Sequence, residues 1–149
     1  MRAVVLLCLL FGGCEGGPPL VEIGTGASRF EPLEDGQSMP LVAGAQGGFH
    51  LWISARARGI DPSDVHLTVV SYPRATERPR QTAFHALELA AREGWLERAG
   101  LVQVLSTPEC FQDREVVVAI HVSDGAGRAA HDERVVIPRA EAPIGACAP

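Results

Sequence analysis

The stretch 114–138, REVVVAIHVSDGAGRAAHDERVVIP, decides the fold class of this chain. Its first half alternates between two sets of residues, Val116, Val118, Ile120 and Val122 against Val117, Ala119, His121 and Ser123. Side chains of a β-strand point alternately to the two faces of a sheet, so this period of two predicts a strand. The DGAG sequence predicts a four-residue turn, and 128–137 is expected to return as the second strand of a β-hairpin. Both faces of the first strand carry apolar residues, which predicts a central strand.

Further strands are expected upstream of this hairpin. In 49–58, FHLWISARAR, the residues Phe49, Leu51, Ile53, Ala55 and Ala57 alternate with His50, Trp52, Ser54, Arg56 and Arg58. The segment 65–73, VHLTVVSYP, alternates in the same way, and LVEIG at 20–24 is a candidate first strand. Between them, Asp35 and Gly36 have the composition of a turn between short apolar pieces.

One segment, 82–100 (TAFHALELAAREGWLERAG), is compatible with two structures. Phe84, Leu87, Ala91 and Trp95 lie at helical spacing, and Ala, Leu and Glu favour helix, which would give one short helix near 84–98. Gly94 interrupts that pattern, and the neighbouring segments are rich in strands. A strand over 85–90, a turn and another short strand are therefore favoured.

Several short strands, frequent turns and no alternation of strands with helices predict an all-β antiparallel sandwich of about seven strands. The closing hairpin is similar to the last hairpin of immunoglobulin-like, PKD-like and cadherin-like bacterial domains. That resemblance implies a fold and no particular activity. Trp52 and Trp95 both precede Cys110, so the immunoglobulin pattern of two core cysteines around a tryptophan is missing. An immunoglobulin-like sandwich is expected rather than a true immunoglobulin domain.

The N-terminus has the three-part layout of an export signal. Arg2 is followed by an apolar run at 3–11, by Gly12 and Gly13, and then by Cys14. The apolar run is shorter than the roughly 20 residues of a membrane-spanning helix.

The sequence LFGGC resembles the lipobox of bacterial lipoprotein signals, with Phe11 where leucine is commoner. The resemblance implies removal of 1–13 and acylation of Cys14, which would anchor the protein in the bacterial cell envelope. Glu15 follows the cysteine and favours the outer membrane over the inner one. The expected organisation is a signal peptide at 1–13, a lipidated tether at 14–20 and a β-sandwich domain at 21–149. The alternative is an ordinary secretory signal in which Cys14 is incidental.

Two cysteines remain after signal removal and acylation of Cys14. Cys110 and Cys147 then form an even pair in an oxidising compartment, so a disulfide between them is expected. The alternatives are a free thiol pair and cysteines linked to a partner. The spacing does not suit CxxC redox chemistry, and two cysteines are too few for a zinc site.

Charge and motifs argue against several functional classes. The formal net charge of -5 argues against nucleic-acid binding, which needs a basic face. No GxSxG or SxxK motif is present, so an enzyme is not expected. Asp124 and Asp132 lie near His121 and His131 in sequence, but aspartate in a hairpin turn is ordinary turn chemistry.

The five histidines do not form a metal-binding motif, because none has HxH, HxxxH or HExxH spacing. His50 and His66 lie on the polar side of two predicted strands, which would permit a surface copper or zinc site if these strands were neighbours. Scattered, partly exposed histidines are the favoured interpretation, with no metal and no cofactor.

A binding face is the remaining candidate site. His50, Trp52, Arg56 and Arg58 share one side of a predicted strand, and arginine beside an aromatic residue is typical of protein interfaces. A solvated sheet surface with Trp52 packed under arginine stems is the alternative. The prediction is a lipid-anchored envelope module that binds or scaffolds an unknown protein partner without catalysis. The alternative function is a small-ligand or metal-binding envelope lipoprotein that uses surface histidines.

Overall fold

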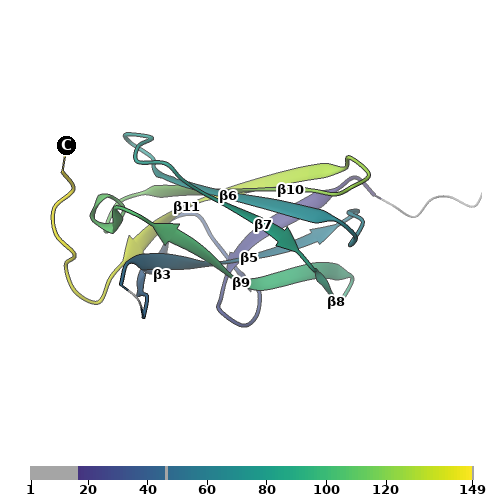
Figure 1. Cartoon of the computed structure of the whole chain (residues 1–149), viewed down its shortest axis with the longest axis horizontal. Helices are drawn as coiled ribbons and strands as arrows, with labels where there is room; N and C mark the ends of the chain where they lie inside the picture. The colour runs from purple at the N-terminus through teal and green to yellow at the C-terminus, as the bar shows by residue number, and fades with distance from the viewer. Residues whose placement is uncertain (1–16, 46, 149) are drawn as a thin grey trace, which may run out of the picture.

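The computed structural model describes residues 17–45 and 47–148, which form two packed β-sheets (Figure 1). The first sheet has the order β2-β1-β5-β9-β8, with β4 paired to β5, and the second has the order β3-β11-β10-β6-β7. The first sheet contains β1 (Leu20–Thr25), β2 (Glu31–Pro32), β4 (Val42–Ala43), β5 (Phe49–Arg58), β8 (Ala90–Arg92) and β9 (Trp95–Leu105). The second contains β3 (Gln37–Pro40), β6 (Val65–Pro73), β7 (Gln81–Leu87), β10 (Val116–Ser123) and β11 (Ala129–Arg139). A single 3-10 turn, Pro108–Cys110, is the only helical element in this part of the chain.

The predicted all-β sandwich is confirmed, with eleven strands in the described residues rather than about seven. Three of the additional strands, β2, β4 and β8, are only two or three residues long and extend the edges of the first sheet. Strands of two or three residues are too short to show an alternating pattern of apolar and polar residues, so the sequence did not predict them. The more specific likeness to immunoglobulin-like domains stays a prediction.

The closing hairpin forms as predicted, and its turn is longer than expected. β10 and β11 pair from Val116↔Val136 to Ser123↔Ala129, and β10 lies between β11 and β6. Val117 is buried on the outer side of β10, as expected for a central strand. Arg128, expected to begin the return strand, belongs to the turn, because its backbone N–H and that of Ala126 both bind the Asp124 carboxylate.

The segment 84–98 contains strands, so the open alternative of a short helix is wrong. β7 pairs with β6, and β8 and β9 form a hairpin in which Arg92 lies opposite Trp95. Glu93 and Gly94 connect them with positive φ angles of 50° and 81°, the conformation of a tight two-residue hairpin turn. Phe84 is 79% exposed, so it is not part of a core-facing helical stripe. Pairing with neighbouring strands overrides the local helix propensity.

The core lies between the inner faces of the two sheets. β5 contributes Leu51, Ile53, Ala55 and Ala57, which are the residues that alternation assigned to its buried face. Other members include Val21, Ile23, Leu67, Val69, Leu101, Leu105, Phe111, Val116, Val118, Ile120 and Val122.

Two polar side chains on the inner side of β11 join the sheets at one edge. The Asp132 carboxylate accepts a hydrogen bond of 3.0 Å from the backbone N–H of Ile23, and Arg134 donates one of 3.1 Å to the carbonyl of Leu33. Both bonds satisfy backbone groups of the first sheet or its loops, and a buried backbone group without a partner is costly. These residues are therefore structural.

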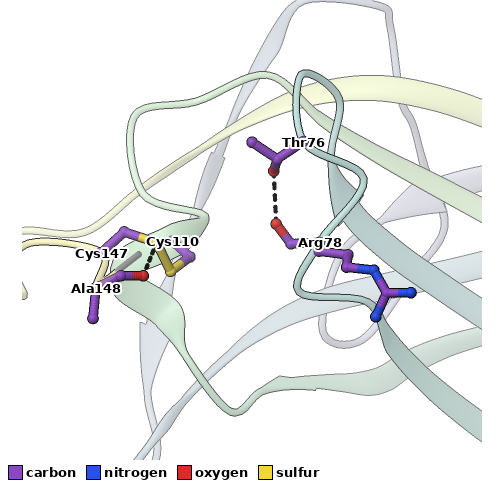
Figure 2. Close-up of a disulfide and its surroundings, with 5 residues drawn as sticks. All are labelled: Thr76, Arg78, Cys110, Cys147 and Ala148. Atoms are coloured by element: carbon purple, nitrogen blue, oxygen red, sulfur yellow. Dashed lines mark hydrogen bonds between the residues drawn. A yellow bond between two sulfur atoms is a disulfide. The ribbon is translucent and has the colours of Figure 1, made fainter.

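The expected disulfide is present between Cys110 and Cys147, whose Cα atoms are 4.6 Å apart (Figure 2). It ties the C-terminal tail to the connection between β9 and β10. The tail is also held by a 3.0 Å hydrogen bond from the backbone N–H of Ile144 to the side-chain oxygen of Gln112.

The predicted signal peptide at 1–13 and the acylation site Cys14 lie outside the described residues. Among residues 17–45 and 47–148, the structure contains no helix of sufficient length and hydropathy to span a bilayer.

Candidate protein-binding face

The predicted binding residues lie together on the outer face of the first sheet, where β5 runs between β1 and β9. His50, Trp52, Arg56 and Arg58 lie at even positions of β5 and point away from its buried apolar residues, while Ser54 on the same side is buried. The structure thus brings all four onto one surface, as the alternation predicted.

Arg56 lies at the centre of a stack that the sequence did not reveal. Its guanidinium carbon is 4.5 Å from the ring centre of Phe30 and 4.5 Å from that of Trp95. Arg58 lies 4.9 Å from the same Trp95 ring. Each contact of this kind is worth about 0.5–1 kcal/mol at an exposed site. We call Phe30, Arg56, Trp95 and Arg58 the arginine–aromatic stack.

The two arginines of the stack differ in their charge pairing. Arg56 forms a 2.6 Å ion pair with Glu22, its cross-strand neighbour on β1. Arg58 forms no ion pair within the described part of the chain, and it is exposed. Its guanidinium therefore remains available to an external carboxylate.

An apolar area lies on the same face beyond Ser54, which is fully buried and donates a hydrogen bond from its hydroxyl to the Gly26 carbonyl. The rings of His50 and Trp52 meet edge to face at 4.8 Å. Val104 lies opposite His50 on β9 and Val102 opposite Trp52, with 56% and 37% of their surfaces exposed. We call Trp52, Val102 and Val104 the apolar patch.

A hollow of about 500 Å³ borders the stack at the N-terminal end of the domain. Arg58 forms part of its wall. The rest of the wall consists of Gly17, Pro18, Pro19, Leu20, Gly59 and Gly94. The hollow offers a recess beside the free guanidinium.

Phe30 and Trp95 are the site residues that sequence reasoning missed. Phe30 comes from the loop between β1 and β2, and Trp95 begins β9 after the tight turn. The only signal was the outward-facing position of the arginines, since an exposed arginine on a sheet stacks on aromatic residues when they are near. Which aromatic residues are near depends on the order of the strands.

The structure does not bring His50 and His66 together. β5 belongs to the first sheet and β6 to the second, so the supposition that these strands are neighbours is wrong. His66 is instead paired with Asp64 at 3.0 Å. No cluster of three or more metal-ligating side chains occurs in the described ranges.

Asp124 and Asp132 have structural roles and do not form hydrogen bonds with His121 or His131 within the described residues. Asp124 accepts hydrogen bonds from the backbone N–H groups of Asp61, Ala126 and Arg128, and from the Arg128 guanidinium. The Asp61 N–H, followed by the Arg128 backbone and guanidinium, lowers the pKa of Asp124 to about 2, against the opposing effect of burial.

We expect the stabilising effect of Asp124 to disappear in acid. Its pKa in the folded state is about 2, below the ordinary value of 3.8, so the carboxylate stabilises the fold above pH 4 and loses this effect as pH falls through 2. In urea unfolding, Asp124→Asn should be less stable than the wild type by a constant amount between pH 5 and 7. That difference should shrink between pH 4 and 2. A difference that persists unchanged at pH 2 would contradict this role.

Comparison with protein-family models, with curated proteins and with solved structures finds no match for this chain.

Proposed function

We propose that this protein is a lipid-anchored module of the bacterial cell envelope that binds or scaffolds a protein partner and does not catalyse a reaction. The observation that carries the proposal is the outer face of the first sheet, which presents both an exposed apolar patch and the arginine–aromatic stack. Trp and Arg in such surroundings dominate the energy of many protein interfaces.

The side chains of this face indicate which chemical groups the partner should present. The apolar patch would be covered by apolar side chains, because exposed valines and a half-buried tryptophan gain from removal of water. Arg58 has no counter-ion among residues 17–45 and 47–148, so we expect the partner to supply a carboxylate at the hollow beside it. Glu22 neutralises Arg56, which keeps the stack rigid in the absence of the partner.

The N-terminal sequence supports the proposed location in the cell envelope. The resemblance of LFGGC to a lipobox makes Cys14 the acyl acceptor, with the outer membrane favoured by Glu15. Only five residues lie between Cys14 and Leu20, the first residue of β1, which limits the span between these two residues to about 20 Å. The stack and its hollow lie at the same end of the domain as this tether, so a partner in the envelope would bind close to the membrane.

The hydrogen bonds of the histidines and aspartates also agree with a binding role. Within the described residues, no histidine shares a hydrogen bond with a serine, threonine or cysteine, and His66 is bonded to Asp64. Asp124 and Asp132 are occupied by backbone N–H groups and arginines.

Substitutions on this face are expected to release the partner. Wild-type protein, Arg58→Glu and Trp52→Ala would be expressed at equal levels and purified gently from the native membranes, and co-purifying proteins would be quantified by mass spectrometry. Loss of a hot-spot residue costs about 2 kcal/mol or more, so recovery of the partner should fall about tenfold or more in both variants.

Phe84→Ala is the matched control, since Phe84 is an exposed apolar residue on the other sheet. Its recovery of the partner should equal that of the wild type. Circular dichroism would verify that all variants are folded. Equal recovery from the wild type, Arg58→Glu and Trp52→Ala would overturn the proposed face.

A further inference from the structure

The outer face of the second sheet contains a pair of histidines that the sequence separates by ten positions. His121 on β10 lies directly opposite His131 on β11 in the antiparallel register. Both residues are exposed, while Ile120 and Val122 on either side of His121 are buried. The two imidazoles therefore leave the sheet on the same side, next to each other.

Cross-strand neighbours of this kind have Cβ atoms about 4.5–5.5 Å apart. An imidazole nitrogen binds a transition metal at about 2.0–2.1 Å, so two facing histidines span a single ion without any change in the backbone. The sheet fixes their spacing in advance: β10 is a central strand paired on both sides, and its register with β11 runs unbroken over eight residue pairs.

The surroundings of the pair favour a cation. On the same face of the sheet, the next cross-strand pairs on either side are Ala119 with Glu133 and Ser123 with Ala129. None of these four residues carries a positive charge. Glu133 lies two residues from His131 on the same face and forms no ion pair in the described part of the chain. On β6, the residue opposite His121 is Thr68. No positively charged side chain of these pairs repels an ion held between the two imidazole rings.

We propose that His121 and His131 form a two-histidine surface site for a late first-row divalent metal ion, with Cu²⁺ bound most tightly. Imidazole nitrogens suit copper, nickel and zinc, and the order of affinity for a given set of nitrogen ligands peaks at Cu²⁺. Water completes the coordination, and Glu133 contributes negative potential near the ion. The site is independent of the binding face, because it lies on the opposite sheet.

The test is a titration of the full chain with Cu²⁺ in competition with a chromophoric chelator, for the wild type, His121→Ala and His131→Ala. We expect one ion per chain at this site and a loss of affinity of about tenfold or more in each variant, because a single imidazole replaces a chelate. Electron paramagnetic resonance of the wild-type complex should show coupling to two imidazole nitrogens. Cu²⁺ should also raise the unfolding temperature of the wild type, since the pair is aligned only in the folded state.

His66→Ala is the matched control. His66 is an exposed histidine on β6, one row from His121 on the same face, but its imidazole is hydrogen-bonded to Asp64. Its removal should leave Cu²⁺ affinity unchanged. Equal affinity in the wild type, His121→Ala and His131→Ala would overturn the site, and so would an equal loss in His66→Ala and His121→Ala.

Discussion

Replacement of Phe111 with alanine is expected to lower the free energy of unfolding by about 3–5 kcal/mol, the usual cost of removing a large aromatic side chain from a core. Phe111 is fully buried and is the largest of the completely enclosed side chains. It follows the 3-10 turn and inserts its ring into the core at the connection between β9 and β10. Truncation leaves a cavity that the paired strands on either side cannot close.

Urea denaturation of Phe111→Ala and Phe84→Ala measures this effect against a matched control. Phe84 is the same residue type at 79% exposure, so its substitution should change stability by no more than about 0.5 kcal/mol. If the two variants were equally stable, Phe111 would not belong to the core and the packing of the sandwich at this end would be wrong.

Loss of the Cys110–Cys147 disulfide is expected to lower the free energy of unfolding by about 2–4 kcal/mol. The two cysteines are 37 residues apart in sequence, and the loop-entropy relation gives about 4 kcal/mol for closing an interval of this length. Cys110 is buried and Cys147 is partly exposed, so Cys147→Ser removes the bond with the smaller disturbance of the core.

Unfolding of the wild type with and without a thiol reductant, beside Cys147→Ser, tests this prediction. The reduced wild type should match the variant, and the reductant should have no effect on the variant. A wild type that is equally stable before and after reduction would contradict a stabilising disulfide.

Much of the sandwich could be predicted because its central strands alternate, residue by residue, between a core-facing apolar set and a second set of residues. β5, β6 and β10 each show clear alternation, and the structure buries the residues that alternation selected. β11 was predicted only because it follows the turn of the closing hairpin, as its second strand. Two of its inner positions are Asp132 and Arg134, because the unpaired backbone of the first sheet requires polar partners there. The alternation within one strand cannot show that backbone groups of the other sheet require polar partners.

The ambiguous segment shows a second limit. Phe84, Ala91 and Trp95 lie at helical spacing, yet each belongs to a different strand. Gly94 was the informative residue, because it permits the tight turn between β8 and β9. Phe84 faces outward and Trp95 stacks on Arg56 and Arg58, so their spacing did not reflect a buried helical face.

The sequence predicted only those residues of the candidate site that lie on a single strand, β5. His50, Trp52, Arg56 and Arg58 were found because they share a face of β5. Phe30, Trp95 and the valines of β9 come from other segments, and their places depend on strand order and register. The same dependence explains why His50 and His66 were wrongly considered together, while the facing pair His121 and His131 was overlooked.

Native mass spectrometry of the wild type and Arg58→Glu, both extracted gently from their own membranes, tests the central claim most directly. For the wild type we expect a chain that begins at an acylated Cys14, contains a disulfide and carries a second protein. For Arg58→Glu we expect the same acylated chain without that protein. An unacylated monomer, or a second protein that Arg58→Glu leaves bound, would contradict the proposal of a lipid-anchored binding module that acts through this face.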